Sequence, residues 1–272
     1  MPDRALLRRF EAGASRYDAH AWAQRQSARD LLAFTTSSLP AAPCAGGAPV
    51  RRVLEPGCGT GLYTRMLLDA FPEAIVFGVD ISEAMARAAR RRIGDPRARF
   101  VVADAEEISA GSYDLITSNA TFQWFLSFPR TVARMASLLR GDGRLTFSFF
   151  GPGTYAELDE ALRAAAAGRG ELSGARVVAT GFLGREEIAA SLSSAFPRWN
   201  VVERRYHQEF PTLADLLRSI RYTGTWRGEA RPGWSPGLLA RVEDAYRERH
   251  GAIRATYHVL LCRGHAAGGG AP

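Results

Sequence analysis

A short loop with alternate glycines offers a place where the backbone can approach a ligand closely. Residues 53–61 read VLEPGCGTG, with Gly57, Gly59 and Gly61 between an apolar run and a stretch of helical spacing. Such a loop can bring a ligand to the N-terminus of a helix. It is not a P-loop, because the chain contains no lysine, and Leu62 stands where a dinucleotide fingerprint that starts at Gly57 requires glycine or alanine.

Three acidic residues follow one another in an order that suits an adenosine-bearing ligand with an amino group. Glu55 precedes the loop, Asp80 ends the next apolar run, and Asp104 ends the third. Asp80 can accept hydrogen bonds from both hydroxyls of a ribose, and Asp104 can accept one from an exocyclic adenine amine. Glu55 can orient the amino group of a cationic ligand. A helix cap is the alternative role for any one of these acids, but the ordered set favours binding.

The elements that must position these residues alternate between strand and helix. Apolar runs predict strands over 51–55, 74–80, 98–104, 113–119 and 144–150, and helical spacing predicts helices over 60–70, 82–92 and 129–140. Ser82 is expected to cap the second helix, and Gly141 and Gly143 to form a turn. Such alternation predicts a parallel sheet with helices on both faces. The carboxyl ends of its strands share one edge, where the three acids should meet.

Helices and two more strands flank this centre. Residues 1–36 read as helical, and a Pro/Gly/Ala-rich linker follows at 37–49. We expect one domain over 50–265, a helical insertion at about 211–250 and a disordered tail at 266–272. The later elements are helices near 154–166, 185–195, 212–222 and 235–249 and strands over 199–210 and 255–264.

Composition predicts a globular, cytoplasmic protein with a basic surface. Apolar residues make up 46% of the 272 residues, no apolar run has the length of a membrane span, and we expect no signal peptide. Cys44, Cys58 and Cys262 are scattered and suggest neither disulfides nor a zinc site. The net charge of +7 lies outside residues 35–197, and residues 198–272 hold 12 arginines against 7 acids. An anionic substrate or an acidic partner could use this charge, although a solvated basic surface is the alternative.

Together these motifs resemble those of the class I S-adenosylmethionine-dependent methyltransferases. The series is LEPGCGTG, then VDIS followed by Met85, then VVADAEE and YDLITSN. The resemblance implies an α/β, Rossmann-like fold with a seven-stranded, mostly parallel sheet and a reversed last hairpin. It assigns binding of S-adenosylmethionine to Tyr17, Glu55, Gly57, Cys58, Gly59, Gly61, Asp80, Ile81, Met85, Asp104, Ala105 and Asn119.

A narrower resemblance covers nearly the whole chain. The segments RFEAGASRYDAHAWAQR, SNATFQW, LTFSFFGPGTYAEL, LLRSIRYTGTW and ATYHVLL are similar to those of the malonyl-[acyl-carrier protein] O-methyltransferases of biotin synthesis. The resemblance implies a malonyl thioester as acceptor, carried by an acyl carrier protein or by coenzyme A. It also implies that residues 1–36 form a lid over the cofactor. The chain departs from the family pattern at Thr121, Phe122, Arg221 and His258.

A carboxylate acceptor makes modest catalytic demands. It is ionised near neutral pH, so alignment and exclusion of water can suffice without a general base. No residue therefore receives a definite catalytic role, although Tyr17 and His20 are candidates. The alternative interpretation is that Tyr17 only packs in the structure and that His20 is an ordinary surface residue. Substrate-binding candidates are Gln123, Trp124, Arg221 and Tyr222. Arg221 is included because an arginine fork matches a carboxylate, and Trp124 could equally anchor the core.

Other functions stay open. The chain could methylate a small free polycarboxylic acid, as in the trans-aconitate methyltransferases, which share an SNA-x-x-QW-like segment. C-methylation of a quinone precursor should need a base, and a non-catalytic module could keep the cofactor pocket alone. We expect no metal, no membrane and no nucleic acid, since an NPPY-type segment is absent and the positive charge is modest.

Overall fold

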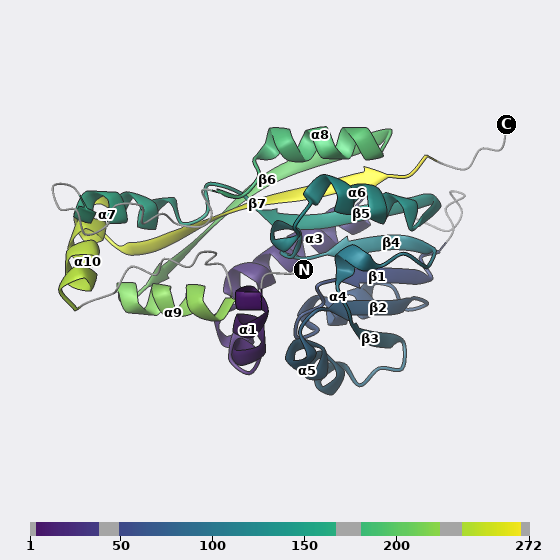
Figure 1. Ribbon diagram of the computed structural model, residues 1–272, viewed down its shortest axis with the longest axis horizontal. Helices are drawn as coiled ribbons and strands as arrows, with labels where there is room; N and C mark the ends of the chain where they lie inside the picture. The colour runs from purple at the N-terminus through teal and green to yellow at the C-terminus, as the bar shows by residue number, and fades with distance from the viewer. Residues whose placement is uncertain (1–3, 38–48, 167–180, 224–235, 268–272) are drawn as a thin grey trace.

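A computed structural model describes residues 4–37, 49–166, 181–223 and 236–267, with a seven-stranded sheet at its centre. The strand order is β3-β2-β1-β4-β5-β7-β6 (Figure 1). The strands are β1 (Arg52–Pro56), β2 (Ile75–Asp80), β3 (Ala98–Val102), β4 (Tyr113–Ser118), β5 (Leu139–Phe150), β6 (Arg198–Phe210) and β7 (Ile253–His265). The first five pair in parallel, and β7 is antiparallel to both β5 and β6. The predicted α/β fold, with its reversed last hairpin, is confirmed.

Helices cover both faces of the sheet, which explains the uninterrupted apolar runs. They are α1 (Arg4–Gly13), α2 (Tyr17–His20), α3 (Trp22–Thr36), α4 (Leu62–Ala70), α5 (Glu83–Ile93), α6 (Phe128–Ser137), α7 (Ala156–Ala166), α8 (Arg185–Ala195), α9 (Leu213–Thr223) and α10 (Pro236–His250), with short 3-10 turns η2 (Ala105–Glu107) and η3 (Phe122–Trp124). α3, α4 and α5 contact one another in series, and α6 packs beside α8 in the other layer (Figure 1). Leu115, Ile116 and Thr117 of β4 are therefore all buried.

The start of β5 differs from the sequence prediction. We expected a turn at Gly141 and Gly143, but β5 already begins at Leu139. Its register against β4 shifts between the pairs Tyr113–Leu139 and Leu115–Arg144, so the residues between them bulge out of the ladder. A Cβ at Gly143 would lie 3.0 Å from the carbonyl oxygen of Tyr113, so a glycine permits this tight bulge.

β6 and β7 form a long antiparallel pair, with α9 and α10 between them in the chain, that extends past the rest of the sheet (Figure 1); we call this pair the β6–β7 hairpin. The pairing of β7 with β5 ends at Val259, whereas its pairing with β6 continues to Ile253. α7, α9 and α10 pack on this extension, and α1 touches both α5 and α9. The hairpin therefore carries α9 to the N-terminal helices.

Three expected segments can be described only in part. Most of the linker, including Cys44, residues 224–235 of the expected insertion and residues 268–272 of the expected tail lie outside the described residues. Among the helices that are described, none has the length and apolar character needed to cross a membrane.

Candidate functional site

The glycine loop after β1 opens toward a cavity at the carboxyl edge of the sheet. Gly57 and Gly59 have φ angles of 69° and 53°, in the left-handed region that favours glycine. The amides of Gly57 and Cys58 donate to the carbonyl oxygen of Val79, at 2.7 and 3.1 Å, which ties the loop to the end of β2. Apart from its chain neighbours, no atom of the described residues lies within 4 Å of a Cβ built at Gly59, so the space beside this residue is open to a ligand.

Asp80 ends β2 and is held by the backbone of two turns. One carboxylate oxygen accepts from the Gly59 amide at 2.8 Å, and the other accepts from the Ser82 amide at 2.9 Å. Burial raises the pKa of Asp80 to about 6, and the nearby Glu11 acts in the same direction. The carboxylate lines the cavity and has lone pairs left for hydroxyl donors.

Glu55 is 1% exposed, and its one hydrogen-bond partner among the described residues is the Thr64 hydroxyl, which donates to it at 2.5 Å. Burial raises the pKa of Glu55 to about 8, so the carboxyl group is mainly protonated at neutral pH. A ligand ammonium group beside it would favour the ionised form. This geometry fits the amino group of a cationic ligand.

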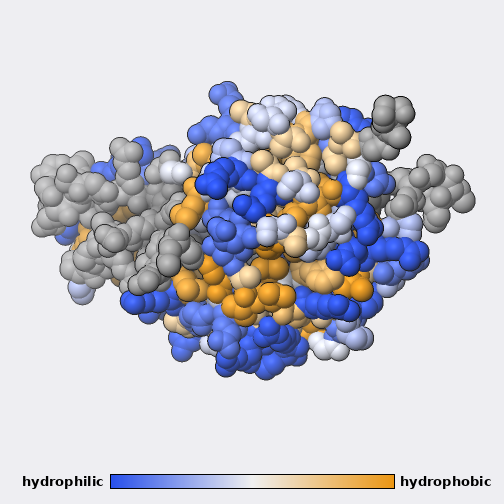
Figure 2. Space-filling view, turned by 45° about the vertical axis from the view of Figure 1, so that its right-hand side comes forward, coloured by the Kyte–Doolittle hydropathy of each residue, from blue (hydrophilic) through white to orange (hydrophobic). Residues whose placement is uncertain are grey.

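Two adjoining cavities connect these acids, and Tyr17, Gly57, Gly59 and Asn119 line both. The larger is lined by Leu7, Phe10, Tyr17, Gly57, Gly59, Val79, Asp80, Ile81, Met85, Asp104, Ala105, Glu106, Asn119, Ala120, Thr121, Trp124 and Phe125. The smaller is lined by Tyr17, Gln24, Glu55, Gly57, Cys58, Gly59, Thr60, Leu62, Tyr63 and Asn119. On the face shown in Figure 2, apolar residues gather near the centre, with hydrophilic residues around them. Because the two cavities share four lining residues, Glu55 in the smaller one lies in the same region of the molecule as Asp80 and Asp104 in the larger one.

The structure brings together every residue of the predicted cofactor set except Gly61. Gly61 precedes α4 with a φ of 81°, and a Cβ there would lie 3.2 Å from Ala89 of α5. This glycine lines neither described cavity, and its lack of a side chain allows α4 and α5 to pack closely.

Asp104 combines the two roles considered for it. Its side chain accepts from the Glu106 amide at 2.9 Å and so caps η2, while the same residue lines the larger cavity. Ile81, Met85 and Ala105 line this cavity as well, and they add apolar surface to the lining that includes Asp80 and Asp104. A flat apolar ring with an amine at its edge would suit this part of the site.

The two substrate-binding candidates that follow β4, Gln123 and Trp124, occupy different surroundings. Trp124 lines the larger cavity and packs edge-on against Phe10, with 6.4 Å between the ring centroids. Gln123, in contrast, is not among the residues that line either cavity. It is buried, its amide nitrogen donates to the Ala120 carbonyl at 2.7 Å, and its Oε1 has no hydrogen-bond partner in the described part of the chain.

His20, Arg221 and Tyr222 meet where α2 contacts α9, outside the lining of both cavities. The rings of His20 and Tyr222 stack at 4.8 Å, and Arg16 donates to the Tyr222 hydroxyl at 2.6 Å. The guanidinium carbons of Arg16 and Arg221 lie 5.5 and 5.9 Å from the Tyr222 ring centroid. Burial, Arg218 and Arg16 all lower the pKa of His20. We call Arg16, His20, Arg221 and Tyr222 the basic cluster.

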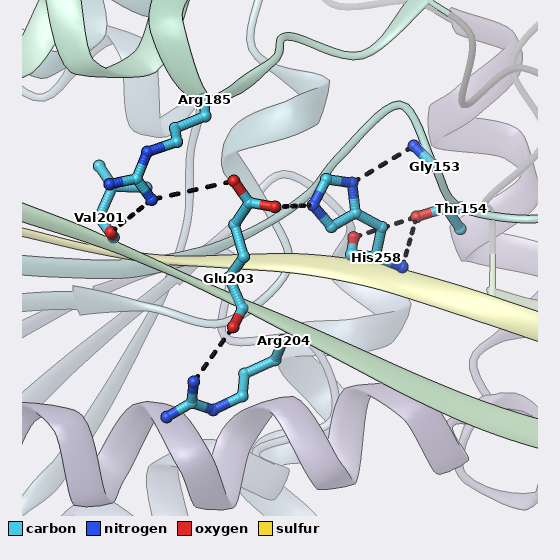
Figure 3. A network of polar contacts seen from close by, with 7 residues as sticks. All are labelled: Gly153, Thr154, Arg185, Val201, Glu203, Arg204 and His258. Atoms are coloured by element: carbon cyan, nitrogen blue, oxygen red, sulfur yellow. Dashed lines mark hydrogen bonds and ion pairs between the residues drawn. The ribbon is translucent and has the colours of Figure 1, made fainter.

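The departures from the family pattern lie mostly away from the cavities. Phe122 stacks on Phe147 in the core, with centroids 4.3 Å apart. His258 lies on β7, where its Nε2 is 3.0 Å from a carboxylate oxygen of Glu203 and its Nδ1 accepts from the Gly153 amide at 3.3 Å (Figure 3). Of the four, Thr121 alone lines a described cavity, where it covers Gly57.

Sequence reasoning missed the apolar residues that α1 contributes to the site. Leu7 and Phe10 line the larger cavity, together with Phe125. The apolar spacing of α1 indicates that one face packs, but not against which surface. In the described ranges, no group of three or more His, Cys, Asp or Glu side chains could hold a metal ion.

Comparisons with known proteins agree with this architecture. Residues 53–143 match a family model described as a methyltransferase domain. The solved YcgJ protein of Bacillus subtilis superposes with a TM-score of 0.56 at 19% identity, covering 86% of this chain and 96% of that one. Phosphoethanolamine N-methyltransferase 2 of Haemonchus contortus, solved with S-adenosylhomocysteine, has a TM-score of 0.52 at 17% identity and covers 88% of this chain and 53% of that one. Both likenesses concern the fold.

Curated relatives match almost from end to end. The malonyl-[acyl-carrier protein] O-methyltransferase of Priestia megaterium is 31% identical, across 94% of this chain and 95% of the relative. The protein of the same name from Geobacter sulfurreducens is 34% identical, across 96% of this chain and 98% of the relative.

Proposed function

Because this chain belongs to the malonyl-[acyl-carrier protein] O-methyltransferase family, we propose that it transfers the methyl group of S-adenosylmethionine to the free carboxylate of a malonyl thioester. The resulting methyl ester would prime pimeloyl synthesis for biotin. Esterification removes a charge that apolar chain-elongation pockets would bind only at a high desolvation cost. The activity thus masks one end of a growing acyl chain.

The observation that carries the proposal is the line of three carboxylates along one site. Glu55 suits the amino group of the donor, Asp80 its ribose hydroxyls, and Asp104 its adenine amine. Within the described part of the chain, the buried Glu55 accepts from one hydroxyl and Asp80 accepts from two amides, so both carboxylates have acceptor capacity left. When bound, the donor supplies a methyl group activated by a sulfonium.

The reaction asks this chain to align groups rather than to move protons. The acceptor carboxylate is already ionised, and its oxygen replaces the sulfur at the methyl carbon. Phe10 and Trp124, packed edge-on, close one side of the larger cavity and exclude water there. Tyr17 lies where the two cavities join, and burial raises the pKa of its hydroxyl, so it acts as a neutral donor.

The basic cluster is the proposed clamp for the acceptor. Arg16 and Arg221 flank Tyr222, and neither pairs with an acid among the described residues. An arginine fork can hold a carboxylate or a phosphate through two hydrogen bonds. Arg16 is the neighbour of Tyr17, so the clamp adjoins the cofactor site. We place the anionic acyl group or its phosphopantetheine arm there.

The basic balance of residues 198–272 supports an acidic partner. Their 12 arginines against 7 acids would favour docking of an acyl carrier protein over coenzyme A alone. We further propose that the protein acts in the cytoplasm and uses neither a metal nor a nucleic acid. Residues 1–36 would form a lid over a methyltransferase domain at 50–265, which includes a helical insertion at about 211–250.

The test is a methyl-transfer assay with methyl-labelled S-adenosylmethionine. Malonyl-carrier protein, malonyl-coenzyme A, free malonate and trans-aconitate are offered separately. We expect a labelled methyl ester on the carrier, formed more efficiently than on the other three. No ester on either thioester would overturn the proposal, and comparable turnover of the free acids would favour the polycarboxylate alternative. Cofactor binding by calorimetry without any turnover would indicate a non-catalytic module.

A further inference from the structure

Residues 4–20, which comprise α1 and α2, form what we call the N-terminal segment, and this segment crosses the cofactor site. Leu7 and Phe10 line the larger cavity, and Tyr17 lines both cavities. A ligand enclosed by these side chains cannot leave past the segment unless the segment moves. What holds the segment in place is therefore relevant to cofactor exchange.

The first attachment joins α2 to the glycine loop and to α5. The Thr60 hydroxyl donates to the Asp18 carboxylate at 2.7 Å, and Arg92 forms an ion pair with the other oxygen of Asp18. Arg92 also donates to the Thr60 hydroxyl at 3.1 Å, so the three side chains form a closed triangle. The Thr60 side chain is buried, whereas the Asp18 and Arg92 side chains are 35% and 36% exposed.

The second attachment joins α1 to the start of α5. The Ser82 hydroxyl donates to Glu11 at 2.8 Å, and the Ala84 amide donates to the same oxygen at 3.3 Å. Ser82 is fully buried, and its hydroxyl also accepts from the Met85 amide as the helix cap. Glu11 thus contacts the turn that follows β2.

These two attachments contact the same turns that position the Asp80 carboxylate. Its carboxylate accepts from the amides of Gly59, next to Thr60, and of Ser82. The N-terminal segment is therefore attached to the same two turns whose amides hold the Asp80 carboxylate. The proximity of Glu11 to Asp80, which raises the pKa of Asp80, agrees with this arrangement.

We propose that Asp18 and Glu11 are positioning residues that hold the N-terminal segment closed over the bound donor, so that both attachments must break before the spent donor leaves. The inference rests on the donor site of the proposed function, but not on the identity of the acceptor. It assigns Arg92 and Thr60 to the first attachment and Ser82 to the second.

The experiment measures the dissociation rate of S-adenosylhomocysteine from the full chain by stopped-flow competition. Asp18→Asn, Arg92→Gln and Glu11→Gln should each raise the rate about three- to tenfold, as expected for partly exposed charge-assisted contacts. The double variant D18N/R92Q should be no faster than the faster single variant, because both changes break one contact. Glu83→Gln and Arg87→Gln provide the matched control: they break an exposed ion pair of 2.6 Å on the same helix and should leave the rate unchanged.

Two further readouts separate positioning from a general loss of structure. Added salt should speed dissociation from the unmodified chain by screening the Asp18–Arg92 pair, and this dependence should flatten in Asp18→Asn. Arg92→Lys should restore part of the slow dissociation. In turnover, KM for the donor should rise more than kcat falls. Rates within twofold of the control in both D18N and E11Q would overturn the inference, whereas a chain that binds no S-adenosylhomocysteine would contradict the donor site itself.

Discussion

At the scale of single residues, the site depends on carboxylates whose charge is costly until a ligand arrives. Burial raises the pKa of Glu55 to about 8 and that of Asp80 to about 6. A structural carboxylate usually gains hydrogen-bond or ion-pair partners on folding, which lowers its pKa. Glu55 and Asp80 instead have raised pKa values and keep acceptor capacity in a cavity, which is typical of a binding site. The free site is thus prepared for a ligand that brings a cation and hydroxyl donors.

Binding of the donor product should release a proton near Glu55. At pH 7 the free carboxyl group, with a pKa of about 8, is mainly protonated, and a ligand ammonium lowers that pKa. Affinity for S-adenosylhomocysteine should therefore rise as pH increases toward 8, by up to about tenfold per pH unit. Calorimetry in buffers of different ionisation enthalpy measures the released proton. Heats that do not depend on the buffer would contradict this assignment, and Glu55→Gln should abolish the dependence.

Replacing Asp80 by asparagine should weaken cofactor binding without unfolding the chain. The amide keeps the shape of the side chain but loses an acceptor oxygen and the charge that the Gly59 and Ser82 amides now satisfy. We expect the Kd for S-adenosylhomocysteine to rise about tenfold or more, since hydrogen bonds to charged groups are the stronger ones. Calorimetry gives the Kd, and circular dichroism checks the fold. An unchanged Kd would remove Asp80 from the ribose site.

At the scale of elements, the glycine loop works because a strand, a turn and a second loop fit together. The loop follows β1, is fastened to the end of β2, and lies under Thr121 from the segment after β4. A Cβ at Gly57 would lie 2.2 Å from the Thr121 hydroxyl oxygen, whereas a Cβ at Gly59 would meet no described residue within 4 Å other than its chain neighbours. Gly57 is thus required by both its positive φ and its close contact with Thr121, whereas Gly59 is required by its positive φ alone.

This difference makes a matched pair of variants informative. Gly57→Ala adds a steric clash to the strain of a positive φ, whereas Gly59→Ala adds the strain alone. We expect Gly57→Ala to lower the free energy of unfolding by about 1 to 3 kcal/mol more than Gly59→Ala does. Adding Thr121→Ala should recover part of that loss. Urea denaturation measures the difference, and equal effects of the two alanines would contradict the tight contact with Thr121.

At the scale of the whole molecule, the long β6–β7 hairpin places α9 against the N-terminal helices. That contact assembles the basic cluster from residues about 200 positions apart, with Arg16 donating to the Tyr222 hydroxyl. The cluster adjoins the cofactor site through Tyr17, and it lies on the part of the molecule that carries the excess positive charge. An acidic partner would meet a complementary surface there.

Use of the carrier substrate should therefore depend on salt and on the basic cluster. Arg16→Gln and Arg221→Gln should each raise the KM for malonyl-carrier protein about three- to tenfold and leave the Kd for S-adenosylhomocysteine unchanged. Added NaCl should raise the same KM in the unmodified chain. Steady-state kinetics at several salt concentrations measure both effects, with Arg87→Gln as the control. A KM that responds to neither change would separate the cluster from substrate binding.

Much of the site could be read from the sequence because its parts are local. Asp80 is the last residue of a strand, and the loop and Asp104 each come after one. Because the strands of a parallel sheet end at one edge, the order of motifs already predicts their convergence. Ser82 caps α5 as expected, because a cap depends on a few neighbouring residues. The alternation of elements likewise determined the fold class.

Tertiary structure alone decided what closes the site and which candidates belong to it. Periodicity shows that α1 and η3 pack, but not that Phe10 meets Trp124 while Gln123 turns inward. Sequence spacing likewise does not show that Asp18 reaches Arg92, 74 positions away, or that Arg16 meets Tyr222. The physical reason is that local propensity and apolar period report on neighbours along the chain, whereas these contacts depend on how separate elements dock.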